Sequence, residues 1–189
     1  MTCIVGVVGK DGKITMGGDS AGSDSSFSLV IRDDPKVFVR GEYVFGFTSS
    51  FRMGQLIHHK LKLPQPPDDP EKLYEFMVTE FIDALRKCFK EGGYMKTKDD
   101  REEGGTFLVG VRGKLFYIES DNQVGIPNDS FAAVGCGDHL ALGSLYTSQG
   151  FKDDRNRVKW ALEAAERFSA GVRRPFVIEY VKPAKRKKK

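Results

Sequence analysis

The chain has 189 residues, 40% of them hydrophobic and 30% charged, a composition typical of one globular domain with a sizeable core. Its net charge of +4 depends on residues 185–189, which supply five positive charges, so the rest of the chain sums to −1. This excludes a broadly basic, nucleic-acid-binding body. We find no 18-residue apolar run and no signal peptide, and the three cysteines are widely separated, so we expect a cytoplasmic protein without a membrane span.

The first half of the chain predicts paired strands followed by a helix. The predicted elements are strands at 3–8 and 13–17, a loop at 20–28, strands at 36–40 and 43–48, and a helix at 51–61. The sequence KDG at 10–12 has the composition of a tight turn, so the first two strands should form a hairpin. The loop is assigned from its Ser, Gly and Asp content.

The second half alternates helices with short strands. The predicted elements are a helix at 70–90, a charged surface loop at 94–105, strands at 106–111, 114–119, near Val124 and at 131–135, helices at 138–148 and 154–169, and a strand at 176–181. Asp69 followed by Pro70 is a helix start signal. We expect the helix at 138–148 to be buried. In the helix at 154–169 the inward residues should be Val158, Ala161, Leu162, Ala165 and Phe168.

These elements predict an α+β fold. Hairpins favour antiparallel sheets, and helices that arrive in pairs can cover the outer face of a sheet. We therefore predict a four-layer αββα sandwich of two antiparallel sheets flanked by helices, formed by one domain over residues 1–182. Residues 183–189 are predicted to be a basic disordered tail, with contact to nucleic acid or an acidic partner as the alternative.

Thr2 is the candidate nucleophile. Methionine aminopeptidases remove the initiator Met before a small residue, which would make Thr2 the first residue. Its freed α-amine, with a pKa of about 7.7–8.0, could then accept the proton of its own hydroxyl. The alternatives are a plain start codon before an edge strand, or Cys3 as the nucleophile if Thr2 were removed as well.

Five short motifs, in order and spacing, resemble the proteasome β-type family of N-terminal nucleophile (Ntn) hydrolases, and most of all its bacterial HslV branch. They are TCIVGV at 2–7, GGDS at 17–20, KV at 36–37, GFTSS at 46–50 and VGCG at 134–137. The resemblance extends to about residue 181 and implies the αββα sandwich of that family. It also implies a threonine-type endopeptidase that hydrolyses unfolded polypeptides inside a ring.

The resemblance implies roles for single residues. Thr2 matches the nucleophile, Lys36 the catalytic lysine, and Asp19 the carboxylate that orients it. A fixed ammonium beside the nucleophile would favour its ionised form and disfavour protonation of the α-amine. Without the resemblance, Asp19 would be a turn cap and Lys36 a solvated lysine at a strand end.

Three positions depart from the family pattern. Ser49 and Ser50 stand where the family has a glycine pair, and the Ser49 N–H would have to stabilise the oxyanion. Cys136-Gly137 replaces Ser-Gly, and a thiol is a weaker hydrogen-bond donor than a hydroxyl. Glu166 and Ser169 replace an Asp-x-x-Ser motif, so Glu166 would have to reach the Thr2 amine with a longer side chain, or be a surface glutamate.

The candidate substrate-binding residues are Ser20, Phe38, Phe47 and Phe51, with core packing as the alternative for the aromatic side chains. We predict no cofactor and no metal. By resemblance, the partners would be a peptide or unfolded protein substrate, further copies of the chain in a homo-oligomeric ring or double ring, and an ATP-dependent unfoldase. The altered motifs leave a second hypothesis open, namely a catalytically inactive Ntn-fold scaffold or binding protein.

Overall fold

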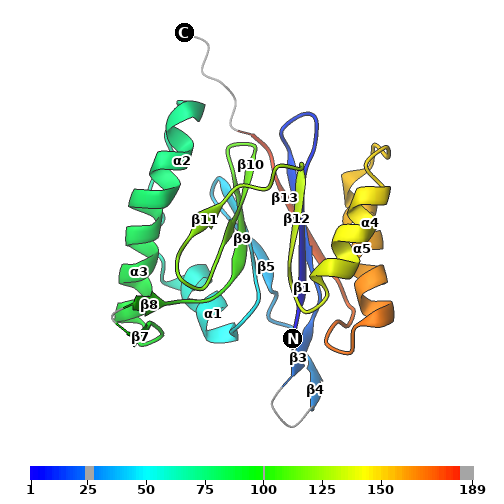
Figure 1. The fold of residues 1–189 in the computed structure, drawn as a ribbon, viewed down its shortest axis with the longest axis horizontal. Coiled ribbons are helices and arrows are strands. Elements are labelled where there is room, and N and C mark those ends of the chain that lie inside the picture. Colours follow the sequence, from blue (N-terminus) through cyan, green and yellow to red (C-terminus); the bar gives the residue numbers. More distant parts are fainter. Residues whose placement is uncertain (24–27, 100, 184–189) are drawn as a thin grey trace.

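Two antiparallel sheets lie face to face, and helices cover the outer face of each (Figure 1). The computed structural model describes residues 1–23, 28–99 and 101–183. Apart from Pro183, the predicted basic tail lies outside these residues. Among the helices that are described, none combines the length and the apolar composition of a membrane span. The predicted four-layer αββα sandwich is confirmed.

The first sheet has the strand order β12-β1-β2-β13, with every neighbouring pair antiparallel. Its strands are β1 (Cys3–Val8), β2 (Ile14–Gly18), β12 (Phe131–Gly135) and β13 (Val177–Val181). The predicted first hairpin is confirmed, with Val8 paired to Ile14 and Gly12 in the turn at a φ of 76°. Pairing of β1 with β12 places Cys3 opposite Gly135, which brings the start of the chain against its second half.

The second sheet has the strand order β11-β10-β9-β6-β5 and is also antiparallel. Its strands are β5 (Val37–Arg40), β6 (Tyr43–Phe47), β9 (Phe107–Val111), β10 (Lys114–Ile118) and β11 (Val124–Gly125). The hairpin turn between β9 and β10 is formed by Arg112 and Gly113, both at positive φ. Apolar side chains from both sheets, among them Ile4, Met16 and Leu108, fill the space between them.

The helices form the two outer layers. On the second sheet lie α1 (Phe51–His59), α2 (Leu73–Phe76) and α3 (Ile82–Glu91), and on the first sheet α4 (Asp138–Thr147) and α5 (Asp154–Phe168). A 3₁₀ turn (Pro70–Lys72) leads into α2, and a π-helical segment (Met77–Phe81) joins α2 to α3, so the predicted helix at 70–90 is one continuous helical run. Asp69 caps its start, as predicted.

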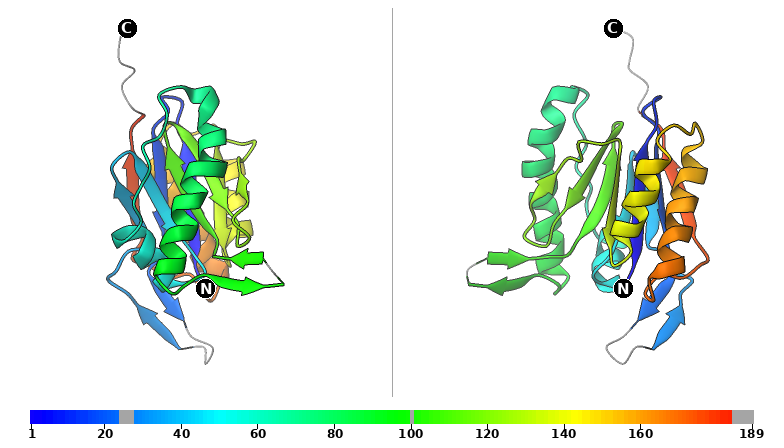
Figure 2. Two further views of the ribbon diagram at one scale, coloured as in Figure 1. Left: turned by 90° about the vertical axis from the view of Figure 1, so that its left-hand side faces the viewer. Right: turned by 45° about the vertical axis from the view of Figure 1, so that its right-hand side comes forward.

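Two predicted loops contain paired strands instead. Within 20–28 and just beyond, β3 (Ala21–Ser23) pairs with β4 (Leu29–Ile31), and within 94–105, β7 (Lys96–Lys98) pairs with β8 (Arg101–Glu103). Both pairs project from the sandwich at the end where the chain begins (Figure 2). Apart from Ala21, which is buried, the described residues of these strands are partly or fully exposed, so neither pair carries the apolar alternation from which strands are predicted.

Two predictions of burial are also wrong. Phe168 is 73% exposed, because it is the last residue of α5 and the chain turns to an extended conformation at Ser169. Helix α4 is only partly buried, through Ala141 and Leu145, because its other side faces solvent. The other inward residues predicted for α5 are buried under it.

Candidate active site

Three polar side chains from separate elements meet in the interior. Thr2 precedes β1, Asp19 follows β2 and Lys36 precedes β5. Lys36 Nζ donates hydrogen bonds to Thr2 Oγ1 at 2.9 Å and to Asp19 Oδ1 at 2.8 Å. All three residues are buried, with exposed fractions of 5%, 1% and 2% for Thr2, Asp19 and Lys36. One lysine therefore connects a hydroxyl and a carboxylate away from solvent.

Asp19 is held by the backbone as well as by Lys36. Its Oδ1 accepts from the Cys3 N–H at 3.0 Å, and its Oδ2 accepts from the N–H groups of Ala21 at 2.9 Å and Arg173 at 3.3 Å. Gly18 allows this arrangement, because a Cβ there would lie 2.8 Å from Ile4 and 2.9 Å from Val37. The carboxylate therefore has a fixed position and can orient Lys36.

Burial and the charge of Asp19 shift the pKa of Lys36 in opposite directions. Burial lowers the pKa of its ammonium below the ordinary value of 10.5, and the hydrogen-bonded carboxylate of Asp19 opposes this shift. The ring of Phe51 lies 5.7 Å from Nζ and contributes to the apolar surroundings. A cation of this kind can stabilise an alkoxide on Thr2 while giving up a proton more easily than a solvated lysine.

The backbone of Thr2 forms hydrogen bonds with two of the predicted site residues, and a third lies next to one of them. The Thr2 N–H donates to Cys136 Sγ at 3.3 Å, and Cys136 Sγ lies 3.5 Å from Ser169 Oγ. The Gly137 N–H donates to the Thr2 carbonyl at 3.4 Å. Cys136 and Gly137 therefore contact the nitrogen and the carbonyl of Thr2, and Ser169 lies next to the Cys136 thiol.

Met1 is the immediate neighbour of this group. The Thr2 hydroxyl donates to the Met1 carbonyl at 2.5 Å, and the Met1–Thr2 peptide bond holds the nitrogen that would be the base.

Cys3, the alternative nucleophile, has an exposed fraction of 0%, and burial raises the pKa of its thiol. A buried, protonated thiol does not suit nucleophilic attack.

Glu166 does not contact Thr2 in the structure. Its two carboxylate oxygens accept hydrogen bonds from the backbone N–H and the guanidinium of Arg174, at 2.6–2.9 Å, and these bonds lower the pKa of the carboxyl. The expectation that Glu166 reaches the Thr2 amine is therefore corrected. The doublet Arg173-Arg174 was the sequence signal for this pairing, and Arg173 also supplies a backbone donor to Asp19.

Ser49 has the backbone conformation that usually favours glycine. Its φ is 63°, and its side-chain oxygen accepts a hydrogen bond from the Thr106 N–H at 3.0 Å. Within the described ranges, no hydrogen bond engages the Ser49 backbone N–H. The Ser49 backbone N–H is thus available to a ligand, even though a serine stands where the family pattern has a glycine.

The four candidate substrate-binding residues have different surroundings. Phe38 and Phe47 are each 4% exposed and pack in the core under the helices, with Phe38 stacked on His58. Ser20 is 5% exposed and donates its hydroxyl to the Pro175 carbonyl at 2.8 Å. Only Phe51 is partly exposed, and the Arg32 guanidinium lies 3.9 Å from the centre of its ring. Phe38 and Phe47 therefore have the core-packing role that was the alternative for the aromatic side chains.

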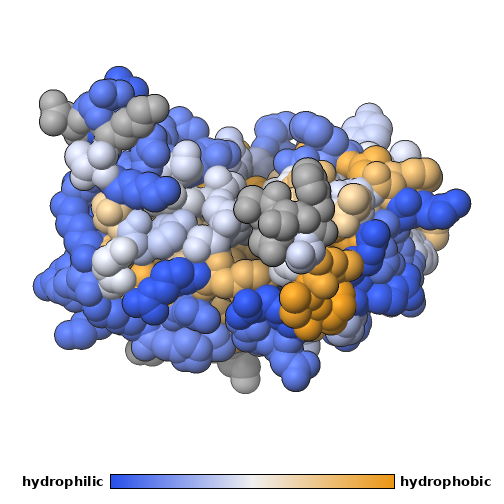
Figure 3. Space-filling model, turned by 90° about the horizontal axis from the view of Figure 1, so that it is seen from below, coloured by the Kyte–Doolittle hydropathy of each residue, from blue (hydrophilic) through white to orange (hydrophobic). Residues whose placement is uncertain are grey.

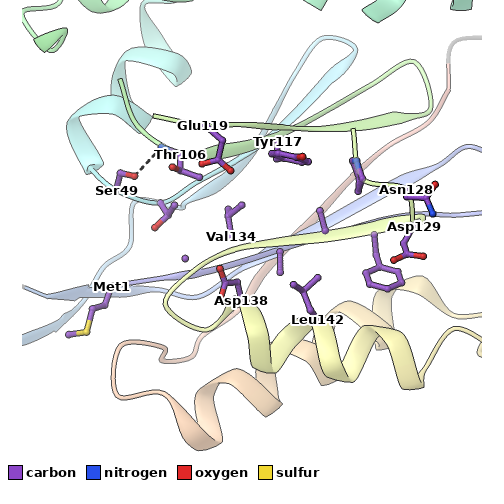
Figure 4. Close-up of a pocket in the computed structure, with 16 residues that line it drawn as sticks. Met1, Ser49, Thr106, Tyr117, Glu119, Asn128, Asp129, Val134, Asp138 and Leu142 are labelled. Carbon is purple, nitrogen blue, oxygen red and sulfur yellow. Dashed lines mark hydrogen bonds between the residues drawn. The ribbon is translucent and has the colours of Figure 1, made fainter. Parts of the chain in front are cut away.

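A pocket of about 670 Å³ opens beside Thr2, between the two sheets (Figure 4). One wall is strand β12, and the other is formed by Thr48, Ser49, Thr106, Tyr117 and Glu119. Met1 and Asp138 lie at one end, and the loop from Pro127 to Asp129 lies at the other. We call it the inter-sheet pocket. Across the described residues, no group of three or more His, Cys, Asp or Glu side chains could hold a metal ion.

Comparisons with known proteins place this geometry in a known fold. No family model and no curated protein sequence matches the chain. Among solved structures, it is similar over 97% of its length to all of Thiobacillus denitrificans BPH in complex with epoxomicin, with 18% identity and a TM-score of 0.77. It is similar over 96% of its length to 99% of HslV from Trypanosoma brucei, with 17% identity and a TM-score of 0.68. The chain has the HslV fold.

A third similar structure is a mutant of Anbu from Hyphomicrobium sp. strain MC1, with 12% identity, a TM-score of 0.65, and coverage of 96% of this chain and 82% of that one. The resemblance to proteasome-type Ntn hydrolases is thus confirmed at the level of the fold. At these identities the HslV fold does not assign roles to residues. Those roles depend on the contacts of Thr2, Asp19 and Lys36.

Proposed function

We propose that this chain is a threonine-type endopeptidase in which Thr2, after removal of Met1, hydrolyses peptide bonds of unfolded polypeptides. The observation that carries the proposal is the buried chain of hydrogen bonds from Asp19 through Lys36 Nζ to Thr2 Oγ1, at 2.8 and 2.9 Å. A nucleophile, a cation and an orienting carboxylate in contact are the parts that an N-terminal threonine requires. No metal or cofactor takes part in this proposal.

The proposed reaction begins with the freed α-amine of Thr2, which takes the proton of Oγ1 directly or through a water molecule. Oγ1 attacks the scissile carbonyl, Lys36 stabilises the developing charge on Oγ1, and the Ser49 N–H donates to the oxyanion. The amine then passes its proton to the leaving nitrogen. A water molecule hydrolyses the acyl-enzyme ester with the same amine as base. Cys136 and Ser169 would hold the amine in place.

The proposed setting is a homo-oligomeric ring or double ring in the cytoplasm. An enclosed chamber would admit unfolded chains only, which would spare folded proteins. An ATP-dependent unfoldase would supply such chains. Support comes from the HslV fold shared with the Trypanosoma brucei protein and with Thiobacillus denitrificans BPH, the latter solved in complex with epoxomicin.

Epoxomicin labelling followed by intact-mass spectrometry tests the proposal. We expect wild-type chain that has lost Met1 to gain the mass of one epoxomicin. Thr2→Ala should gain none, and Thr147→Ala, which changes a threonine of α4 outside the site, should label like wild type. Loss of Met1 without any adduct on Thr2 would contradict the proposal.

The second candidate function is a catalytically inactive Ntn-fold scaffold or binding protein. It is favoured by the pairing of Glu166 with Arg174 instead of with Thr2, and by the Ser49-Ser50 sequence at the oxyanion position. Under this alternative, the mature chain retains Met1 and epoxomicin adds nowhere. The same mass spectrum distinguishes the two functions, because a retained Met1 keeps the Thr2 nitrogen in an amide.

A further inference from the structure

We infer that the inter-sheet pocket binds a basic side chain, Lys or Arg, of the polypeptide substrate, and that Glu119 is the residue that selects it. This inference deepens the proposed function, since it concerns the substrate of the same site. It arises from the position of the pocket next to Thr2, from its shape and from the charges on its walls.

The pocket lies next to the backbone of the candidate nucleophile. Gly135 lines it, and a Cβ added to Gly135 would lie 2.2 Å from the Thr2 carbonyl oxygen and 3.3 Å from Thr48 Oγ1. Ser49, whose N–H we assign to the oxyanion, lines the opposite wall. A polypeptide with its scissile carbonyl between Thr2 and Ser49 therefore has a neighbouring residue at the pocket entrance.

The lining of the pocket is acidic. Glu119, Asp129 and Asp138 contribute carboxylates, and none of the residues along its walls is Lys, Arg or His. Figure 4 shows Glu119 on the wall formed by the second sheet and Asp138 below Val134 on the opposite side. In the part of the chain that is described, neither Glu119 nor Asp129 forms an ion pair, whereas Asp138 lies 3.7 Å from the imidazole of His139. The side chain of Glu119 is thus available to a cation from outside.

Between these carboxylates the walls carry apolar as well as polar surface, the apolar part through Tyr117, Ala132, Val134 and Leu142. A lysine or arginine side chain has the matching structure, with an aliphatic stem and a charged end. An acidic side chain would be repelled, and a short polar one would leave the apolar walls unoccupied. The volume of about 670 Å³ is sufficient for such a side chain together with adjoining backbone.

Peptide binding, measured without turnover, tests the inference. The probes are two fluorescein-labelled peptides of otherwise neutral sequence, one with a central Arg and one with citrulline, its uncharged isostere. Fluorescence anisotropy with the full chain carrying Thr2→Ala, which cannot hydrolyse the peptides, should give at low salt about fivefold tighter binding of the Arg peptide, as expected for one partly exposed charge pair. Glu119→Gln should reduce this ratio to about twofold or less. Glu75→Gln, which changes an exposed glutamate on α2, should leave it unchanged.

Equal binding of the two peptides to the Thr2→Ala chain, absence of binding by both, or an unchanged ratio when Glu119→Gln is added would each overturn the inference. None of these outcomes depends on catalysis. If the Arg peptide binds more tightly but wild type never reacts with epoxomicin, the inference about the acidic pocket stands and the proposed function is wrong. If wild type reacts with epoxomicin but the two peptides bind equally, the proposed function stands and the inference about the pocket is wrong.

Discussion

Lys36 and Asp19 form an ion pair that is almost fully buried, with side-chain exposures of 1% and 0% and an N–O distance of 2.8 Å. Such a pair does little for stability by itself, because desolvation of both charges offsets their attraction. Removing one partner is different, since it leaves the other charge buried and uncompensated. At the scale of single residues, the site should therefore be sensitive to the loss of either charge and less sensitive to the loss of both.

We expect Lys36→Met to lower the free energy of unfolding by about 3–5 kcal/mol, because the Asp19 carboxylate is then left with backbone donors only. The double variant Lys36→Met/Asp19→Asn should be less destabilised than the sum of the two single variants. Urea unfolding at neutral pH measures all three. The matched control Lys159→Met, at an exposed position on α5, should remain within about 0.5 kcal/mol of wild type. Simple additivity of the two single changes would mean that the pair does not interact.

At the scale of elements, strand pairing is what presents Thr2 to the rest of the site. Antiparallel pairing of β1 with β12 places Gly135 opposite Cys3, directly against the Thr2 carbonyl. Gly135 has a φ of 105°, a conformation open to glycine and strained for other residues. This position therefore combines a backbone requirement with a steric one.

Gly135→Ala should lower the free energy of unfolding by about 3 kcal/mol and displace Thr2 from Lys36. The control is Gly143→Ala in α4, where an added Cβ meets nothing within 4 Å and helix propensity favours Ala by about 1 kcal/mol. Denaturation curves give the stabilities, and epoxomicin labelling under folding conditions reports on Thr2. Gly135→Ala with wild-type stability and labelling would show that Thr2 tolerates displacement of β12.

The sequence predicts elements well where one face is buried. The hairpin of β1 and β2, the strand pairs of the second sheet and the helices have apolar patterns that reflect the core. The pairs β3–β4 and β7–β8 lack such a pattern, because they project into solvent and are held by backbone hydrogen bonds that any composition can form. The same reasoning explains Phe168, since helical spacing predicts a face but not where the covered sheet ends.

For the site, residue types and spacing alone could not predict which side chains lie close together in space. Thr2 and Lys36 lie 34 residues apart, and their contact depends on the stacking of the two sheets, with β2 against β5 and β6. Only the family resemblance brought them together in advance. Glu166 illustrates the limit of that approach, because motif position assigned it to Thr2 while the nearby Arg174 provided a stronger partner.

At the scale of the whole molecule, the pair β3–β4 stands apart from the sandwich at the end where the chain begins (Figures 1 and 2). Its strand β4 exposes three consecutive apolar residues, Leu29, Val30 and Ile31, with exposed fractions of 46%, 61% and 48%. Figure 3 views this end and shows hydrophobic surface on it. A protruding apolar strand with an unpaired edge would promote aggregation of a monomer, and such strands are common at interfaces between subunits.

If the chain forms the proposed ring, β4 should lie in a contact between copies, and its assembly should respond to a charge placed there. We expect wild type to elute in size-exclusion chromatography with light scattering as a multimer, and Val30→Asp to shift most of it to the monomer with an unchanged circular dichroism spectrum. Burying a carboxylate without a partner opposes the contact, whereas Val78→Asp, at an exposed position before α3, should leave the assembly intact. A Val30→Asp protein of wild-type size would place the contact elsewhere. A wild-type monomer at high concentration would argue against the ring itself, because a chamber cannot be enclosed by one copy.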